Sequence, residues 1–187
     1  MWKLQENILE QSDKDKLSDF INSTDRFTQF NMVKQFEKEW SKWQGCKYSV
    51  FVNSGSSADL VMLDGVKEYY QIPDESEVIV PAATWTTNIT SVIQTKLKPV
   101  FVDINLNDLS FNYDAVEKAV TSRTKIILIT HLIGLPANIT KIKHIAEKHN
   151  LIVLEDCCES HGAVYEGKKI GNHGIAGTFS FYWGHHM

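Results

Sequence analysis

The stretch TKIILITHLIGLPANITKIKHIAEKHNLIVLED, residues 124–156, decides the fold class. It contains two short apolar runs, KIILIT (125–130) and LIVLE (151–155), separated by a segment long enough for a helix. Both runs are almost continuously apolar and do not alternate with polar residues, which is typical of strands that helices cover on both faces. The stretch therefore predicts a strand–helix–strand unit of a parallel sheet.

Further apolar runs extend this pattern in both directions along the chain. They are YSVFV (48–52), VIV (78–80), PVFVD (99–103) and GTFSFYW (177–183). Strands that alternate with helix-length segments predict an α/β protein, a three-layer fold with a mainly parallel sheet. In such sheets ligands bind beyond the carboxyl ends of the strands, so the residues that follow each run are the candidates for chemistry.

The N-terminal region, residues 13–45, is predicted to be helical, because apolar side chains recur there at three- and four-residue spacing among charged ones. The apolar positions are Leu17, Phe20, Ile21, Met32, Val33, Phe36 and Trp40. The pattern indicates an amphipathic helical arm that precedes the first strand.

Composition excludes several classes of function. The 187 residues carry a net charge of −4 and no block of Lys or Arg, so we expect neither nucleic acid nor a membrane surface as a partner. No apolar window of about 18 residues occurs, so no membrane span is expected either. The three cysteines, Cys46, Cys157 and Cys158, are a poor basis for disulfides, which favours a cytoplasmic protein.

Two motifs follow strands and could bind a charged ligand. In VNSGSSADL (52–60) a turn of small residues leads into a helix expected to begin at about Ser56, and free amides at such a helix start bind anions. A plain helix cap is the alternative. In LEDCCESHGA (154–163), Asp156 could hold a cationic ring nitrogen or could simply cap a turn, and Cys157 and Cys158 are expected to be packed thiols.

Two further motifs complete the set. PAATWTT (81–87) places Trp85 where its indole could lie against a planar cofactor or fill the core. In GTFSFYWGHHM (177–187), Ser180 lies five residues before His185. His185 and His186 could be exposed, metal ligands or catalytic, and a metal site would need a third ligand such as His161 or His173.

In this order the motifs NSGSSA, PAATWTTN, TKIILITHLIGLPANITKI, LEDCCESHGA and GTFSFYWGHHM resemble the sugar aminotransferase family, the DegT/StrS group of fold type I pyridoxal phosphate enzymes. The resemblance implies an aspartate-aminotransferase-like large domain over residues 25–187, preceded by a helical arm, 1–24. It also implies that the smaller C-terminal domain is absent, so that the chain is truncated.

The resemblance also implies roles for individual residues. Gly55, Ser56 and Ser180 would bind the cofactor phosphate, Trp85 would stack on the pyridine ring, and Asp156 would pair with the ring nitrogen. Most members carry a lysine five residues after that serine, which binds the cofactor covalently.

This chain has His185 at the lysine position, and imidazole cannot form that covalent bond. The chain is similar to a branch of 3-dehydratases that have His-His there, and it carries the acidic Glu159 that this branch tends to have among the residues near the cofactor.

The implied reaction is removal of the 3-hydroxyl of a nucleotide-linked 4-keto-6-deoxyhexose, as in deoxysugar and O-antigen synthesis, with His185 as the base. The cofactor would be pyridoxal or pyridoxamine 5'-phosphate, held without a covalent bond, with glutamate as an amino donor and a homodimer as the assembly. A cluster usually needs four cysteine ligands, and the three cysteines seen here do not decide the question, because others could lie in the absent half; we expect no iron–sulfur cluster. An aminotransferase and a non-catalytic homologue are the alternatives.

Overall fold

The computed structural model describes residues 9–185, which fall into two compact units that divide between Phe51 and Val52. The boundary that the resemblance implies, between residues 24 and 25, stays a prediction. None of the helices in residues 9–185 combines the length and the apolar character that a bilayer span requires.

The first unit contains α1 (Gln11–Ser23) and α2 (Asn31–Gln44). The helical prediction for residues 13–45 is confirmed except for a break at residues 24–30, which begins where Thr24 becomes extended. Its hydroxyl accepts a hydrogen bond from the Arg26 amide at 3.2 Å, a local bond that competes with the helical pattern. α2 ends at Gly45, which adopts the left-handed conformation typical of a helix C-terminus.

The strand predicted at residues 48–52 is wrong. This segment has no strand partner, and Tyr48 and Val50 are 77% and 75% exposed. Its backbone bonds to side chains, since the Phe51 amide donates to Glu37 Oε1 at 2.8 Å. The apolar run therefore extends along the first unit and joins no sheet.

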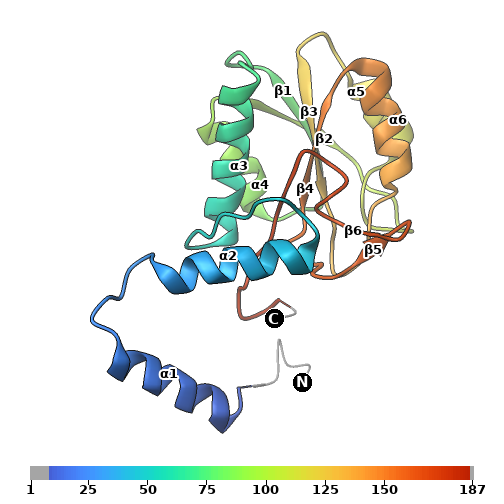
Figure 1. The fold of residues 1–187 in the computed structure, drawn as a ribbon. Coiled ribbons are helices and arrows are strands. Elements are labelled where there is room, and N and C mark those ends of the chain that lie inside the picture. Colours follow the sequence, from blue (N-terminus) through green and yellow to red (C-terminus); the bar gives the residue numbers. More distant parts are fainter. Residues whose placement is uncertain (1–8, 186–187) are drawn as a thin grey trace. The chain divides into compact units, whose positions relative to one another are not determined.

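The second unit is built on a five-stranded sheet, in the order β2-β1-β3-β4-β7 (Figure 1). Its strands are β1 (Glu77–Pro81), β2 (Lys98–Val102), β3 (Thr124–Thr130), β4 (Ile152–Asp156) and β7 (Ala176–Thr178). All four neighbouring pairs are parallel, which confirms the α/β prediction. A separate antiparallel pair, β5 (Val164–Tyr165) and β6 (Lys168–Lys169), lies between β4 and β7 in the chain.

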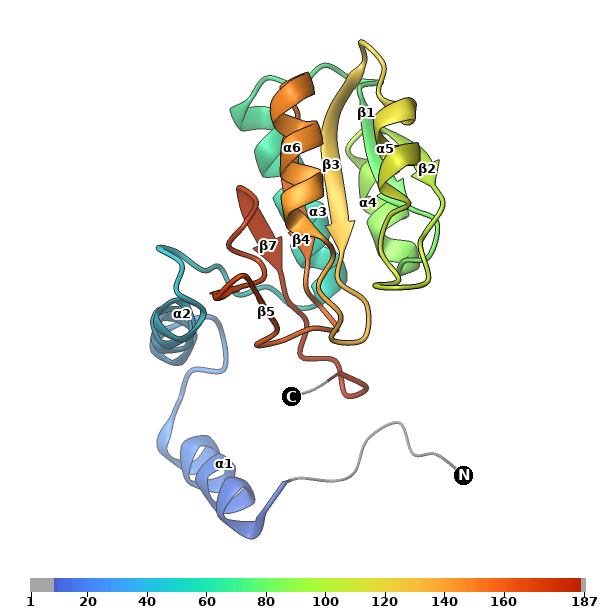
Figure 2. The ribbon, with the colours of Figure 1, turned by 90° about the vertical axis from the view of Figure 1, so that its right-hand side faces the viewer.

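Two helices cover each face of the sheet and make the three layers (Figure 2). α3 (Gly55–Tyr69) and α4 (Thr86–Gln94) lie on one face, and α5 (Tyr113–Ala119) and α6 (Ile139–His149) lie on the other. Alternate residues of β1, β3 and β4 enter the two cores, as period-two side-chain geometry requires. Each fully buried aliphatic side chain contributes roughly 1.5–3 kcal/mol to stability.

The alternation along β4 positions the site. Leu154 packs in the core beside α3 and α4, whereas Val153 packs in the core beside α5 and α6. The next two residues, Glu155 and Asp156, continue this alternation at the carboxyl end of the strand. The two neighbouring carboxylates therefore point to opposite faces of the sheet.

Candidate functional site

A cavity opens at the carboxyl edge of the sheet, where the predicted ligand-binding positions lie. Its lining comes from the start of α3, the loop after β1, the ends of β3 and β4, and the segment after β7. The lining residues are Ser54, Gly55, Ser56, Asp59, Trp85, Thr87, Thr130, His131, Leu132, Asp156, Cys158, Glu159, Ser180, Tyr182 and His185. All seven residues predicted from the sequence for the site are among them.

The start of α3 and the segment after β7 form the anion-binding part of the cavity. Ser54 caps the helix by accepting a hydrogen bond from the Ser57 amide at 3.1 Å, and α3 itself begins at Gly55. A Cβ added at Gly55 would lie 2.7 Å from Ser180 Cβ and 3.0 Å from Cys158 Sγ. Glycine is needed here because it lets the backbone approach Ser180, which brings amide and hydroxyl donors together at the helix start.

Two buried carboxyl groups lie in the adjoining part of the cavity. Asp156 accepts a hydrogen bond from the Cys158 amide at 2.9 Å, and Asp59 accepts one from the Thr178 hydroxyl at 2.7 Å. Oxygens of the two carboxyl groups lie within 4.8 Å of each other and of Cys158 Sγ. Burial, followed by the charge of Asp156, raises the pKa of Asp59 to about 8.

Asp59 was missed by the sequence analysis. One signal could have found it, because Asp59 lies four residues after Gly55 and therefore on the same face of α3. His131 and Tyr182 were also missed, since neither belongs to a pattern that singles it out before the chain folds.

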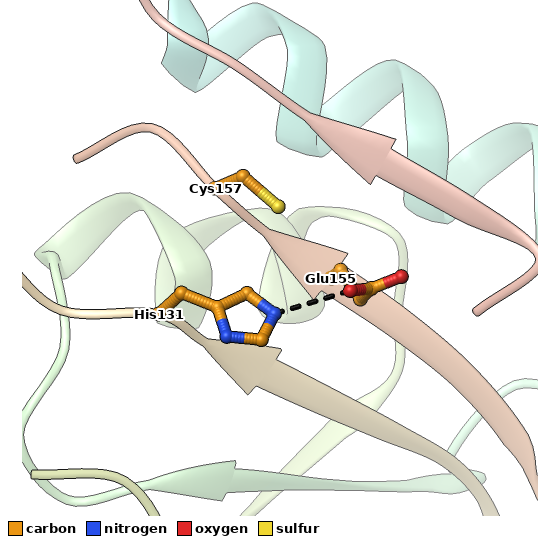
Figure 3. A group of neighbouring side chains, drawn as sticks. All are labelled: His131, Glu155 and Cys157. Atoms are coloured by element: carbon orange, nitrogen blue, oxygen red, sulfur yellow. Dashed lines mark hydrogen bonds and ion pairs between the residues drawn. The ribbon is translucent and has the colours of Figure 1, made fainter. Parts of the chain in front are cut away.

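On the opposite side of β4, a buried histidine and carboxylate form a second layer beneath the cavity (Figure 3). His131 Nε2 lies 3.1 Å from Glu155 Oε2, and both side chains are fully buried. The Ala137 amide donates to His131 Nδ1 at 3.1 Å, so Nδ1 is unprotonated and Nε2 carries the proton. The pair is therefore a hydrogen bond from a neutral imidazole to a carboxylate.

Glu155 also holds the segment that leads into β7. Its two oxygens accept hydrogen bonds from the amides of Gly171, His173 and Gly174 at 2.8, 2.7 and 2.6 Å. Burial works to raise the pKa of Glu155, but the hydrogen bonds from His131 and from the Gly174 and Gly171 amides outweigh it and hold the pKa below its ordinary value. Glu155 is therefore an anion that fixes the segment before β7 to the end of β4.

Cys157 completes the group drawn in Figure 3. Its side chain is fully buried and packs with Ile139 and Ile170, which confirms the expectation of a packed thiol. Burial, with the nearby carboxylates, raises the pKa of the Cys157 thiol well above its ordinary value. Cys158, by contrast, lines the cavity.

Trp85 and Glu159 flank the cavity mouth. Trp85 is 60% exposed, so the alternative that it fills the core is wrong. Glu159 Oε2 accepts a hydrogen bond from the Ile133 amide at 3.2 Å, which orients the carboxylate from the loop after β3.

His185 closes the lining after β7. Its Nδ1 lies 3.3 Å from the Ser180 carbonyl oxygen, which can only accept, so Nδ1 carries the proton and Nε2 of a neutral imidazole is the proton acceptor. His186 lies outside the described residues. Within residues 9–185, the groups of side chains arranged to share a metal ion include none of His161, His173 and His185.

Comparisons with known proteins agree with this geometry. The model of the DegT/DnrJ/EryC1/StrS aminotransferase family matches residues 7–187. The chain is 40% identical to the GDP-4-keto-6-deoxy-D-mannose 3-dehydratase of Yersinia pseudotuberculosis over 171 residues, which are 89% of this chain and 43% of the relative.

Two solved structures of such a dehydratase are also similar. The E. coli enzyme with bound hydrated PLP has a TM-score of 0.94 and 35% identity over 100% of this chain and 48% of its own. A GDP-4-keto-6-deoxymannose-3-dehydratase with a trapped PLP-glutamate geminal diamine has a TM-score of 0.94 and 34% identity. The match covers 100% of this chain and 49% of that enzyme's chain. The chain thus spans about half the length of the relatives that it matches.

Replacing Gly55 with alanine tests the close approach of α3 to Ser180. In an ordinary helix, Gly→Ala stabilises by up to about 1 kcal/mol. Here the added Cβ at 2.7 Å from Ser180 Cβ must displace the backbone, and such overpacking costs about 1–3 kcal/mol, so Gly55→Ala should destabilise the protein. Urea unfolding measures the effect. Gly65→Ala in the same helix, where the new Cβ meets nothing within 4 Å, is the control and should stabilise; equal shifts of both variants would contradict the geometry.

Replacing Glu155 with glutamine tests the second layer. Glutamine keeps one of the two accepting oxygens, so two of the four donors would lose their acceptor at roughly 1–3 kcal/mol each, and Glu155→Gln should lower the free energy of unfolding by at least about 2 kcal/mol near neutral pH. Because the folded pKa of Glu155 is lowered, its stabilisation is present above the ordinary value of 4.5 and is lost as the pH falls below that value. The difference in free energy of unfolding between wild type and Glu155→Gln should therefore become smaller at acidic pH.

The control for this experiment is Glu147→Gln, which removes the same charge from an exposed position of α6. It should change stability little at any pH. A Glu155→Gln variant as stable as the control would show that Glu155 does not hold the segment before β7.

Proposed function

Because the chain belongs to the DegT/DnrJ/EryC1/StrS aminotransferase family, we propose that its cavity binds pyridoxal or pyridoxamine phosphate and that the whole protein removes the 3-hydroxyl of a nucleotide-linked 4-keto-6-deoxyhexose. One observation carries the proposal. The cavity combines an anion-binding helix start and a buried carboxylate with a histidine, and its lining in residues 9–185 includes no lysine or arginine.

The residues present fit this cofactor. A phosphate fits in the cavity at the start of α3, where Gly55 lets the helix approach Ser180 and where the amides of α3 and the hydroxyls of Ser56 and Ser180 can donate to it. Trp85 offers an exposed aromatic face for the ring, and Asp156 offers a carboxylate for the ring nitrogen. When bound, the cofactor supplies an amine that joins the keto group of the sugar and a ring that draws electrons away.

The reaction then needs a proton acceptor and a fixed charge from the protein. Asp156 keeps the ring nitrogen protonated, because a buried carboxylate favours an adjacent cation. With its Nδ1 oriented by the Ser180 carbonyl, His185 would accept a proton at Nε2 from the methylene group of the cofactor and would pass it to the departing 3-hydroxyl, which leaves as water. Glu159 adds a second negative charge beside the cofactor.

The substrate and amino donor follow from the relatives. The dehydratases that the chain is similar to act on GDP-4-keto-6-deoxymannose, and one was captured with a PLP-glutamate adduct. We therefore propose a GDP-linked keto-sugar and glutamate for this protein. Amination of the sugar is the second candidate, because the family includes aminotransferases.

The proposed reaction predicts the behaviour of His185→Asn. In the whole protein with pyridoxal phosphate, glutamate and GDP-4-keto-6-deoxymannose, loss of the 3-hydroxyl should fall by about 10²–10⁴-fold, while the absorbance titration of the cofactor stays nearly unchanged. His144→Asn, on the exposed side of α6, is the control and should keep full activity.

Borohydride treatment of the wild-type protein separates the two candidate reactions. The intact mass should show no cofactor attached to the chain, because imidazole cannot hold it covalently. A cofactor recovered on a lysine, or an amino-sugar product, would support the aminotransferase instead. Unchanged dehydration by His185→Asn would remove His185 from its role.

We also propose that the whole protein is a homodimer that works in the cytoplasm. Large side chains near the cavity are exposed, namely Trp85, Ile133, Tyr182 and Trp183, and a partner subunit would cover such a surface. The three cysteines are free, which suits a reducing compartment. Light scattering on the active protein should give twice the mass of one chain, and an active monomer would overturn the assembly.

A further inference from the structure

The proposed reaction uses Asp156 and leaves its neighbour Asp59 without a role. Asp59 is 1% exposed, lines the same cavity, and comes from α3, whereas Asp156 comes from the end of β4. Oxygens of the two carboxyl groups lie within 4.8 Å of each other. A second buried carboxyl group beside the one that would hold the ring nitrogen requires a physical explanation.

The surroundings do not neutralise two negative charges. Asp59 accepts hydrogen bonds from the hydroxyls of Thr178 on β7 at 2.7 Å and Thr87 on α4 at 3.4 Å, and neither donor is a cation. Among the described residues, the lining contains no lysine or arginine, and Glu159 adds a further acid. His185 and His131 also line the cavity, and His131 donates its Nε2 proton to Glu155 on the other face of β4.

The thiols near the pair do not offset its charge either. Burial raises the pKa of both Cys157 and Cys158 above the ordinary value, and the carboxylates raise it further, so both remain neutral. Two carboxylates this close in a buried site cannot both be ionised, and one of them must keep a proton.

The hydrogen bonds indicate which carboxyl group is protonated. Asp156 accepts from the fixed backbone amide of Cys158, a donor that stabilises the ionised form. Asp59 bonds to hydroxyls, which can rotate to donate or to accept. Burial, and then the charge of Asp156, also raise the pKa of Asp59 to about 8, in agreement with this assignment.

We propose that Asp59 is a positioning residue of the cofactor site, which holds the single proton of the Asp59–Asp156 pair so that Asp156 alone is charged. When a cationic ring nitrogen binds to Asp156, Asp59 releases this proton to solvent, because the added positive charge favours its ionised form. The release rests on the proposed function, whereas the shared proton belongs to the protein alone.

The shared proton makes stability depend on pH with a defined sign. In the unfolded chain Asp59 ionises near its ordinary value of 3.8, but in the folded protein it stays protonated up to about pH 8. A carboxyl group whose pKa is higher in the folded than in the unfolded protein stabilises the fold most at a pH below its unfolded pKa. This stabilisation is lost as the pH rises from the unfolded pKa to the folded pKa. The asparagine side chain of Asp59→Asn would mimic the protonated acid at every pH, so this variant should not lose the stabilisation as the pH rises.

The first experiment measures unfolding by urea from pH 5 to 9 in the whole protein without cofactor. The control is Asp64→Asn, which changes an exposed position of α3. With rising pH, wild type and this control should both lose free energy of unfolding relative to Asp59→Asn. The difference in free energy of unfolding should become constant above about pH 8. Parallel pH profiles for Asp59→Asn and the control would overturn the proposal.

Infrared spectroscopy of the wild type covers the case in which Asp59→Asn does not fold. A protonated carboxyl band should be present at neutral pH and disappear as the pH rises through about 8. Its absence at neutral pH would overturn the shared proton.

The last experiment measures proton release by calorimetry of pyridoxal phosphate binding, in two buffers that differ in ionisation enthalpy. At neutral pH wild type should release up to one more proton per bound cofactor than Asp59→Asn, a difference that a merely structural role would not produce. Equal proton counts would overturn the release. If wild type binds no pyridoxal phosphate, the proposed function fails, while the pH profiles and the infrared band still decide whether Asp59 holds the proton.

Discussion

The buried carboxylate of Glu155 is the interaction on which the rest of the site depends. It is fully buried at the carboxyl end of β4, and it accepts hydrogen bonds from His131 after β3 and from three amides in the segment before β7. One anion thus joins the ends of three strands that are neighbours in the sheet. A buried charge is tolerated only with such a set of donors, so the loops that carry these donors cannot move independently.

Because side chains alternate between the two faces of a β-strand, neighbouring residues of β4 have different roles. Glu155 and Cys157 lie with His131 on one side of β4, whereas Asp156 and Cys158 lie with Asp59 on the other. The first group is closed and structural, since its carboxylate is saturated by hydrogen bonds. The second group faces the cavity at the start of α3, where an anion and a cation of one ligand could bind close together.

This arrangement explains how a site whose lining in residues 9–185 contains no lysine or arginine can suit a phosphorylated, cationic ring. The phosphate would be held by backbone amides and hydroxyls around Gly55 and Ser180, and the ring nitrogen by a carboxylate. In the proposed function, a histidine in place of a lysine would leave the cofactor free to exchange and would supply a base with a defined tautomer. The similarity to dehydratases over the whole chain agrees with this chemistry.

The sequence by itself determined the fold class and the motif positions, because buried parallel strands such as 125–130 and 151–155 have a local composition that few other structures share. It also led to Gly55, which begins a helix, and to Asp156, which ends a strand, and the family resemblance of the motifs led to Ser180 and His185. It misled at residues 48–52, where an apolar run has no strand partner. Only the tertiary structure decided that Asp59 faces Asp156 and that His131 binds Glu155, because these contacts join residues 97 and 24 positions apart (156 − 59 and 155 − 131), and burial, which sets their charges, exists only after packing.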